Sequence, residues 1–324
     1  MISYNNNILK INNKWLRGID FNPLKLPPLT IRVRYTYNID HSGDSQHWTF
    51  VESYDGNYIW DLHLYNTYYS SALSGLDGVT EIVAANIKDI EYLGGGLVNQ
   101  SAYLTKCCSL DLSGASIIGG LFSYCTALTE PPEYIKVSNA LTIHNAFSGC
   151  YHLEKGTTKF IDADNVLTCG YLYAGCYSLT EVSDIILPNV TATTSMFDGC
   201  TSLTKIGNLD MKPRTAVKMF NECHALEQIP NFDTSETVDM RSMCYECNSL
   251  VEIPLINTQS VTSVTQTFYK CNSVSGGALD LYNQMSTQAN PPSYHNLTFY
   301  NCGIDTPTGA AELAQIPSDW KTYN

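Results

Sequence analysis

Hydrophobic residues recur at a fixed interval through the middle of the chain. Residues 196–274 read MFDGCTSLTKI, MFNECHALEQIP, MCYECNSLVEIP and TFYKCNSV, which are versions of the unit F-x-x-C-x-S-L-x-x-I-P. Cys200, Cys223, Cys247 and Cys271 are separated by 23, 24 and 24 residues. A period between twenty and fifty residues predicts a solenoid, because each unit can bury its apolar face only against its neighbours.

The aromatic and leucine positions of the unit predict the packed interior. We expect the phenylalanines to fill the widest part of each coil, and the leucines to line the inward face of a short strand. These residues are Phe197, Phe220, Phe268, Leu203, Leu226 and Leu250. Proline cannot donate a hydrogen bond into a strand ladder, so Pro230 and Pro254 predict the end of that strand in their coils.

The period begins earlier in a less regular form. Val79-x-x-Ile82 stands where Leu203-x-x-Ile206 stands later, although no cysteine precedes it. The next coils pair Leu104 with Cys107 and, only 18 residues on, Phe122 with Cys125. The interpretation is that Leu104 replaces the repeat phenylalanine, as Cys244 does later. Phe147 with Cys150 and Tyr173 with Cys176 follow at intervals of 25 and 26 residues.

The cysteines follow the repeat rather than the pattern of a disulfide framework. Neighbouring strands lie about 4.8 Å apart, and parallel side chains keep their Cβ atoms near that spacing, beyond the roughly 3.8 Å that a disulfide prefers. We therefore expect free, buried thiols that act as small hydrophobic groups. The predicted ladder consists of Cys107, Cys125, Cys150, Cys176, Cys200, Cys223, Cys247, Cys271 and Cys302.

The two ends of the chain depart from the repeat. Leu29–Tyr37 alternates apolar residues with Arg32, Arg34 and Thr36, which predicts a strand buried on one face. Strands over 48–52 and 58–64 would complete a small antiparallel module behind an extended arm. At the other end, the pattern predicts helices over 278–288 and 309–316 around a last coil, LTFYNC, covering the open edge of the solenoid.

The predicted fold class is therefore an α+β repeat solenoid, a leucine-rich-repeat stack of short parallel strands. We expect three parts. Residues 1–70 form an arm and β module that serve as a mount, residues 71–274 form the solenoid, and residues 275–324 form a helical cap with the last coil.

Composition narrows the classes of partner. Hydrophobic residues make up 44% of the chain, which is typical of a folded protein, and the net charge is -13 without any basic run. Nucleic acids and anionic membrane surfaces are therefore disfavoured as partners. The first residues lack the apolar core of a secretory signal, and no stretch reaches eighteen apolar residues. We expect a protein that is made in a cytoplasm and not inserted in a membrane.

Candidate chemistry is sparse. Cys244-x-x-Cys247 is half of a zinc site, but no second pair lies at ligand spacing. His152 and His224 stand beside ladder cysteines, yet adjacent residues of a strand point in opposite directions. Residues 162–165 hint at a calcium loop but lack its glycine and distal glutamate. Motifs for nucleophilic, phosphate or zinc chemistry are missing. We expect no enzyme activity, no cofactor and no metal.

Two outward columns are candidates for contacts. The residues directly after the cysteines form a ridge of aromatic and polar groups, similar to surfaces used in recognition. The binding candidates there are Tyr151, Tyr177, Thr201, His224, Asn248 and Asn272. Two residues after each leucine a second column mostly alternates in charge, and we interpret it as structural register. This charged column consists of Glu130, Lys155, Glu181, Lys205, Gln228 and Glu252.

The unit F-x-x-C-x-S-L-x-x-I-P resembles the cysteine-bearing leucine-rich repeats of the BspA-like surface-protein family. The resemblance covers Val79 to Cys302 and implies the fold, while the family's members include adhesins and proteins that bind host proteins. The flanks, NPLKLPPLTIRVRY from Asn22 and PPSYHNLTFYNCGIDTPTGAAELAQIPSDW from Pro291, look like modules found with these repeats in proteins of gut bacteriophages and prophages.

The resemblance and the residues together favour a non-enzymatic binding protein. The first hypothesis is a virion appendage, such as a tail fibre or spike, that contacts a host surface glycan or protein through the repeats. Other virion proteins would bind its N-terminal region, and this hypothesis allows a homo-oligomer in the particle. The second hypothesis is a bacterial cell-surface adhesin, which requires export. The third is a glycan-cleaving enzyme, which requires two carboxylates roughly 5 to 9.5 Å apart in a cleft.

Overall fold

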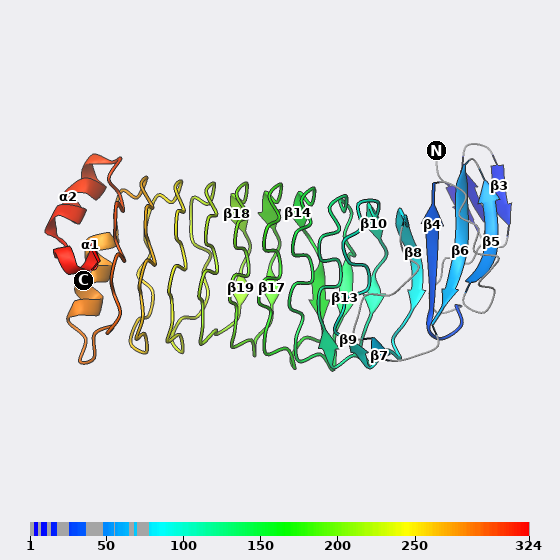
Figure 1. Ribbon diagram of the computed structural model, residues 1–324, viewed down its shortest axis with the longest axis horizontal. Helices are drawn as coiled ribbons and strands as arrows, with labels where there is room; N and C mark the ends of the chain where they lie inside the picture. Colours follow the sequence, from blue (N-terminus) through cyan, green and yellow to red (C-terminus); the bar gives the residue numbers. More distant parts are fainter. Residues whose placement is uncertain are drawn as a thin grey trace.

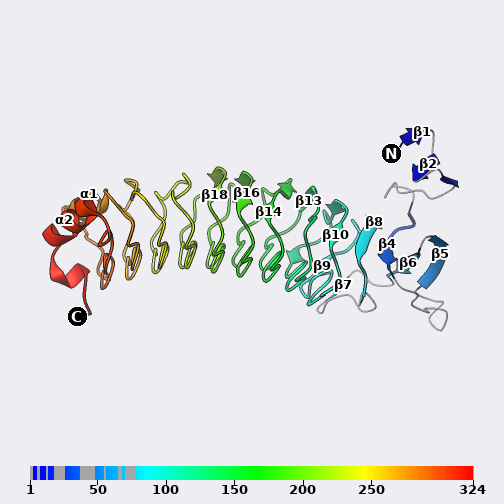
Figure 2. The same cartoon turned by 90° about the horizontal axis from the view of Figure 1, so that it is seen from above.

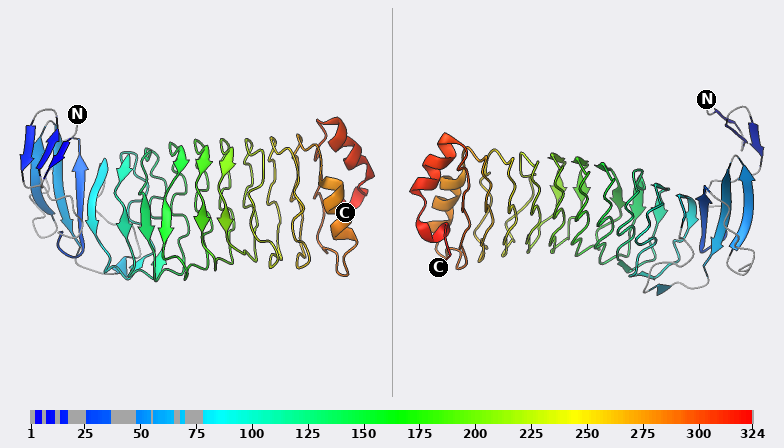
Figure 3. Two further views of the ribbon diagram at one scale, coloured as in Figure 1. Left: turned by 180° about the vertical axis from the view of Figure 1, so that it is seen from behind. Right: turned by 45° about the horizontal axis from the view of Figure 1, so that its top comes forward.

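The chain folds into a long solenoid with an antiparallel sheet at one end and two helices at the other (Figure 1). The computed structural model describes residues 3–5, 8–11, 14–17, 26–36, 48–54, 56–64, 68–69 and 78–323. Successive coils lie side by side along one axis, which bends slightly in the view from above (Figure 2). The predicted fold class is confirmed, because short parallel strands, an antiparallel sheet and terminal helices are all present (Figure 3).

The antiparallel strands lie where the alternation of residues predicted them. Strands β4 (Thr30–Tyr35), β5 (Trp48–Tyr54) and β6 (Asn57–His63) pair in the order β4-β6-β5. In the segment expected to be an arm, β1 (Ser3–Asn5), β2 (Ile8–Ile11) and β3 (Lys14–Arg17) pair in a separate antiparallel sheet.

Both faces of β4 are shielded from solvent, which corrects the expectation of a strand buried on one face only. Arg32 is 8% exposed, and its guanidinium donates hydrogen bonds to both carboxylate oxygens of Asp61, at 2.7 and 2.8 Å. Arg34 forms an ion pair with Glu81. A bidentate carboxylate partner compensates a guanidinium for the loss of water. Alternating charged residues in this strand therefore did not indicate exposure.

One strand joins the sheet to the solenoid. Strand β8 (Glu81–Asn86) pairs antiparallel with β4 and parallel with β10 (Lys106–Cys107). Its residue Ile82 lies opposite Cys107. The first coil therefore begins where Val79-x-x-Ile82 predicted it. The division at residues 70 and 274 stays a prediction, since β8 contributes to both sheets.

Three columns of parallel pairing run along the solenoid axis. The first includes β14 (Lys155–Gly156), β16 (Glu181–Val182) and β18 (Lys205–Ile206). The second includes β11 (Leu110–Asp111), β13 (Tyr134–Lys136), β15 (Lys159–Ile161), β17 (Ile185–Ile186) and β19 (Leu209–Asp210). The third includes β7 (Tyr68–Tyr69), β9 (Tyr92–Leu93) and β12 (Ile117–Ile118), and continues as single-residue bridges from Thr142 to Tyr294. Each coil is thus hydrogen-bonded to the next on several sides.

Proline weakens the first column more than the sequence predicted. Glu130, which precedes Pro131 and Pro132, and Glu252, which shortly precedes Pro254, each form only an isolated bridge. The coil of Pro230 has no strand at this position. Proline has no N–H to donate into the ladder, and in these coils only an isolated bridge or no strand forms, so proline here prevents the strand rather than ending it.

A stack of aromatic rings fills the interior. The rings of neighbouring coils are nearly parallel, with interplanar angles of 4 to 23° and centroids 5.3 to 5.8 Å apart. They belong to Phe122, Phe147, Tyr173, Phe197 and Phe220. Cys244 interrupts the stack in the next coil, and Phe232 packs against Phe220 with centroids 6.3 Å apart. The stack resumes with Phe268 and Phe299.

The register of the early coils differs from the prediction at Leu104 and Cys107. The Cys125 thiol donates to the carbonyl of Val98, as later thiols donate to the carbonyls of the repeat phenylalanines. Val98 therefore occupies the phenylalanine position, Ser101 the cysteine position, and Leu104 the leucine position. Cys107 lies in β10, outside the ladder. The interval from Ser101 to Cys125 is an ordinary 24 residues, and the short interval of 18 was a misalignment.

The C-terminal helices cover the open end, as predicted (Figure 1). Helix α1 (Ala278–Ser286) buries Leu281 and Met285, and helix α2 (Pro307–Gln315) starts at Thr306, whose side chain accepts a hydrogen bond from the Gly309 N–H. A 3₁₀ turn, η3 (Ser318–Trp320), places the Trp320 ring against Phe299 of the last coil. In the described part of the chain, no helix has the length and apolar content needed to cross a membrane.

Candidate functional site

Each coil turns a sharp corner around its ladder cysteine, and the corner uses two left-handed residues. Positive φ angles recur five residues and one residue before the cysteine, for example at Tyr171 and Gly175 before Cys176. Glycine occupies the second position in three coils, at Gly149, Gly175 and Gly199. These glycines were the available sequence signal, but non-glycine residues in other coils obscured it. The residues hold strained backbone, since left-handed geometry costs about 1 kcal/mol or more for a residue with a Cβ.

The ladder thiols fix this corner from inside by hydrogen bonds between coils. The Cys176 Sγ donates to the carbonyl of Phe147 at 3.0 Å, and the Cys200 Sγ to that of Tyr173 at 3.1 Å. The same bond recurs at Cys125, Cys150, Cys223, Cys247 and Cys271. All these cysteines and Cys302 are buried and free. The thiols are therefore donors as well as the small hydrophobic groups that the sequence predicted.

Burial disfavours the thiolate form at several of these positions. It raises the pKa of the Cys176 thiol from 9.0 to about 12, and it raises the pKa of the Cys200 and Cys223 thiols as well. A nucleophile or a metal ligand needs the thiolate form. The raised pKa at Cys176, Cys200 and Cys223 thus favours packing and hydrogen bonding over thiolate chemistry.

The candidate chemical groups have structural partners instead. The Cys247 thiol donates a hydrogen bond to the carbonyl of Phe220. The carbonyl of Cys244 accepts a hydrogen bond from the Cys271 thiol. Asp162 forms an ion pair with Lys136 at 3.3 Å. Within the described residues, no group of three or more His, Cys, Asp or Glu side chains is placed to hold a metal ion.

The two histidines beside the ladder do not meet the thiols. His152 is exposed, and its Nδ1 lies 2.6 Å from the carbonyl oxygen of Thr126. His224 is half-buried, and its Nε2 has no hydrogen-bond partner within the described chain. The neighbouring thiols of Cys150 and Cys223 donate to carbonyls in the interior. The geometry of a cysteine–histidine nucleophile is therefore missing at both positions.

The outer side of the corner forms a continuous surface, which we call the corner ridge. It consists of the residues two before, one before and one after each ladder cysteine, from the coil of Cys125 to that of Cys302. The predicted binding residues lie on this ridge, but most are half-buried; of those six, only Tyr177 is exposed. Thr201 and His224 also lie on the ridge, and no ring contact of His224 is found among the described residues. The amide of Asn248 donates to the carbonyl of Lys270 at 3.1 Å. With its amide turned over, Asn272 donates to the carbonyls of Asn301 and Lys270.

Three tyrosines of the ridge form a first cluster, which we call the neutral stack. Tyr151 and Tyr177 stack with centroids 5.1 Å apart, and Tyr124 meets Tyr151 edge-on at 6.4 Å. A Cβ on Gly149 would lie 2.6 Å from the Tyr124 ring, so that ring rests on bare backbone. The structure thus brings together two predicted residues and one, Tyr124, that the sequence reading missed.

A second cluster, the charged stack, lies in the coils nearer the helical cap. Tyr245, Tyr269 and Tyr300, each two residues before its cysteine, stack with centroids 4.6 and 4.9 Å apart. Lys270 pairs with Glu246 at 2.9 Å, and its Nζ lies 5.3 Å from the Tyr269 ring centre. The hydrogen bond to Glu246 raises the pKa of Lys270. The motif Y-x-C in three coils was the signal for this cluster.

The charged column lies on a different face from the ridge. Its residues Lys155, Glu181 and Lys205 lie opposite one another on neighbouring strands. Lys106 pairs with Glu130 at 2.7 Å, and Glu181 lies between Lys155 and Lys205 at 3.9 and 3.7 Å. These exposed pairs contribute about 0.2 to 1 kcal/mol each. Among the described residues, no ion pair links Glu130 to Lys155, because Pro131 interrupts the ladder there.

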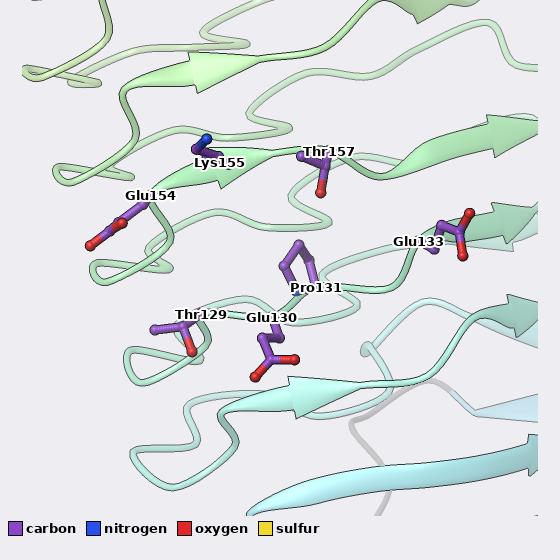
Figure 4. Close-up of a pocket in the computed structure, with 7 residues that line it drawn as sticks. All are labelled: Thr129, Glu130, Pro131, Glu133, Glu154, Lys155 and Thr157. Atoms are coloured by element: carbon purple, nitrogen blue, oxygen red, sulfur yellow. The ribbon is translucent and has the colours of Figure 1, made fainter. Parts of the chain in front are cut away.

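A shallow depression of about 390 Å³ occupies this interruption (Figure 4). Its lining includes Glu130, Glu133 and Glu154, the carboxylates that a glycan-cleaving enzyme would need. Glu154 and Glu133 lie on opposite sides of Pro131, and Glu130 is paired with Lys106 (Figure 4). Glu130 and Glu133 come from one coil, and Glu154 comes from the next.

The repeat also identifies the family. The family described as "Mycoplasma protein of unknown function, DUF285" matches residues 98–208 and again residues 180–282. Together the matches span more than half of the chain. The chain belongs to the DUF285 family. Its match lies within the segment that resembles BspA-like repeats, and that resemblance is confirmed at the level of the repeat. No curated protein and no solved structure gave a match.

Membership of the DUF285 family describes the repeated coils and says nothing about a ligand. The matched residues include the neutral stack and Tyr245 and Tyr269 of the charged stack, whereas the N-terminal sheet and α2 lie outside them. The ridge is therefore built on the part of the chain that defines the family.

Proposed function

We propose that this chain is a non-enzymatic recognition protein that binds a cell surface through the corner ridge. One observation carries the proposal. Tyrosine side chains at the corner of successive coils stack on one another along the outer side of the solenoid. Repetition along the axis makes such a surface extended, and tyrosine combines a large apolar area with a polar tip. A ligand that spans several coils would gain contacts at each one.

We further propose that the protein is carried on a phage virion as a tail fibre or spike. Support comes from the resemblance of both flanking segments to phage modules. The N-terminal sheet lies at the end of the axis opposite the helical cap (Figure 3), a suitable place for an attachment to other virion proteins. The host partner is a surface glycan or protein. The same ridge would serve a bacterial cell-surface adhesin, which remains the second candidate.

Cell binding by the purified full-length chain tests the recognition function. Fluorescently labelled protein is expected to bind candidate host bacteria saturably, and a variant with Tyr124, Tyr177, Tyr245 and Tyr269 replaced by alanine is expected to lose most of that binding. A quadruple change of surface tyrosines away from the ridge, including Tyr103 and Tyr134, serves as the control. Saturable binding that survives loss of the ridge tyrosines would contradict the role of the ridge.

Two further measurements separate the candidates. Antibody against the coils should label intact particles in electron micrographs if the protein is a virion appendage, and the bacterial envelope if it is an adhesin. Incubation with host polysaccharide should release no shorter products. Product release would instead favour a glycan-cleaving enzyme.

A further inference from the structure

We propose that the neutral stack, formed by Tyr124, Tyr151 and Tyr177, is the subsite for an uncharged glycan chain lying along the solenoid axis. This inference rests on the proposed recognition function and names the chemical class of its ligand. It also assigns different roles to the two tyrosine clusters of the ridge.

The rings of the neutral stack leave an aromatic face open to a ligand. Tyr124 is 48% exposed and Tyr177 is 51% exposed. Tyr151 covers one face of Tyr177, and the ridge of the next coil, formed by Asp198, Gly199 and Thr201, carries no aromatic ring. A Cβ built on Gly199 would lie 3.9 Å from the Tyr177 ring, so the floor beside the ring is bare backbone. The C–H face of a pyranose packs against such a ring as other apolar groups do.

Hydrogen-bond acceptors line the same corner. The carbonyl oxygens of Tyr151, Tyr177 and Thr201 accept no hydrogen bond from any described part of the chain. By contrast, the carbonyls of Phe147 and Tyr173 inside the coil accept bonds from the ladder thiols. Hydroxyl groups of a sugar are donors that match free carbonyls spaced one coil apart. The subsite therefore combines an apolar ring with polar groups that orient the ligand, as small-molecule sites do.

The charge of this segment selects an uncharged ligand. In the coils of Cys125, Cys150 and Cys176 the ridge carries no charged side chain. Its residues there are Ser123, Tyr124, Thr126, Ser148, Gly149, Tyr151, Ala174, Gly175 and Tyr177. The rest of the molecule gives a net charge of -13, which disfavours an acidic polysaccharide in the first encounter.

The spacing of the coils favours a glycan over a peptide. Adjacent parallel strands lie about 4.8 Å apart, which is close to the length of one pyranose unit in an extended chain. An extended peptide rises about 3.3 Å per residue, so its side chains would lose register with the rings after one coil. A glycan lying along the axis can instead place one sugar unit on the open face of Tyr177 and the next units beside the free carbonyls of neighbouring coils.

Calorimetry with the intact chain tests the subsite. The probes are two neutral polysaccharides, dextran and yeast mannan, together with xyloglucan oligosaccharides, and two acidic ones, polygalacturonate and heparin. A proline-rich peptide is included as a different class of aromatic-binding ligand. We expect binding of at least one neutral probe and none of the acidic ones. Tyr177→Ala should weaken that binding by about tenfold or more, a change of about 1.4 kcal/mol.

Matched variants give the experiment its control. Tyr103→Ala removes an exposed tyrosine that lies away from the ridge and should leave glycan affinity within about threefold of the unchanged chain. Tyr177→Phe keeps the ring and should also bind. Circular dichroism checks the fold, and Tyr124→Ala replaces Tyr177→Ala if the latter fails to fold.

Three results would overturn the inference: no binding of any neutral probe at millimolar concentration, preference for an acidic probe, or equal losses for Tyr177→Ala and Tyr103→Ala. Binding of the peptide alone would assign the stack to a protein ligand. Cell-binding measurements on the same variants separate this failure from failure of the proposed function. Saturable cell binding that neutral glycans do not compete would retain the recognition function and reject the subsite.

Discussion

Two aromatic ladders run through the same coils, one inside and one outside, and they differ in what surrounds them. The inner rings, such as Phe197 and Phe220, are fully buried and lie 5.7 Å apart. The outer rings Tyr151 and Tyr177 stack at 5.1 Å, but they keep solvent on one side. The comparison shows that a repeat can place the same side-chain chemistry in register twice, and that burial alone decides whether the column stabilises the fold or is available to a ligand.

The largest expected effect is the loss of an inner ring. Phe197→Ala removes a ring that stacks on both neighbours and leaves a cavity, so we expect the free energy of unfolding to fall by about 3 to 5 kcal/mol. Urea denaturation followed by circular dichroism measures this change. Tyr177→Ala, the matched change in the outer ladder, should alter it by about 0.5 kcal/mol or less. Equal losses in the two variants would contradict the division into inner and outer ladders.

Alkaline pH should act on the inner column through its thiols. The folded state raises the pKa of Cys176 from 9.0 to about 12, so the folded chain binds a proton that the unfolded chain releases first. The stabilising contribution is complete below pH 9 and is lost as the pH rises toward 12. The midpoint of urea denaturation should therefore fall steadily over this range.

A Cys176→Ala variant controls for tyrosine ionisation, because it keeps every tyrosine. Its midpoint should depend less steeply on pH between 9 and 12 than that of the unchanged chain. An identical pH dependence in the two proteins would show that this thiol contributes nothing.

The corner backbone joins the two ladders. Substitutions at the same corner position of two different coils should give smaller effects, of opposite sign. Gly175 has φ +71°, so Gly175→Ala should destabilise the fold by about 1 to 2 kcal/mol. Glu222 holds the equivalent position with φ +55°, and Glu222→Gly should be neutral or slightly stabilising. Denaturation midpoints of the two variants test this contrast, and a stabilising Gly175→Ala would show that the corner is not strained.

The smallest expected effect belongs to the exposed charged column. Glu181→Gln removes the partner of both Lys155 and Lys205, and we expect a loss of about 0.2 to 1 kcal/mol that shrinks in high salt. Glu154→Gln is the control, since Glu154 forms no ion pair among the described residues. Equal effects of the two changes at low and high salt would assign no role to the register of this column.

Much of the inner ladder could be predicted from sequence because its slots accept few residue types. Phenylalanine, cysteine and leucine recur at fixed offsets from Cys200 onward, and only side chains of that size fill the interior. Where the slot residues changed, the prediction was wrong: Val98 and Ser101 replaced the phenylalanine and the cysteine, and Leu104 was assigned to the wrong column. A hydrophobic residue of a different shape, such as Val98, still fills the interior position. The sequence pattern alone, however, does not show which position of the repeat that residue occupies.

The outer surface could be predicted only in part because solvent tolerates many residues. The residue after each cysteine was expected to be exposed, yet most of these residues are half-buried, and Asn248 uses its amide to link coils. Tyr124 and the charged stack lie at other offsets, which the repeat unit did not mark. The left-handed corners were obscured for the same reason, since Glu222 and Lys270 adopt a conformation usually assigned to glycine.

The shared position of every ladder cysteine has a consequence for length. Because each coil contacts only its neighbours and presents the same thiol, ring and corner to both sides, one whole coil can be removed between two cysteines and the ends still fit. Deletion of residues 201–223 would join Cys200 directly to His224, so Cys200 would take the place of Cys223 in the repeat. Gain or loss of such segments would let related chains vary in reach while keeping the same attachment and the same cap.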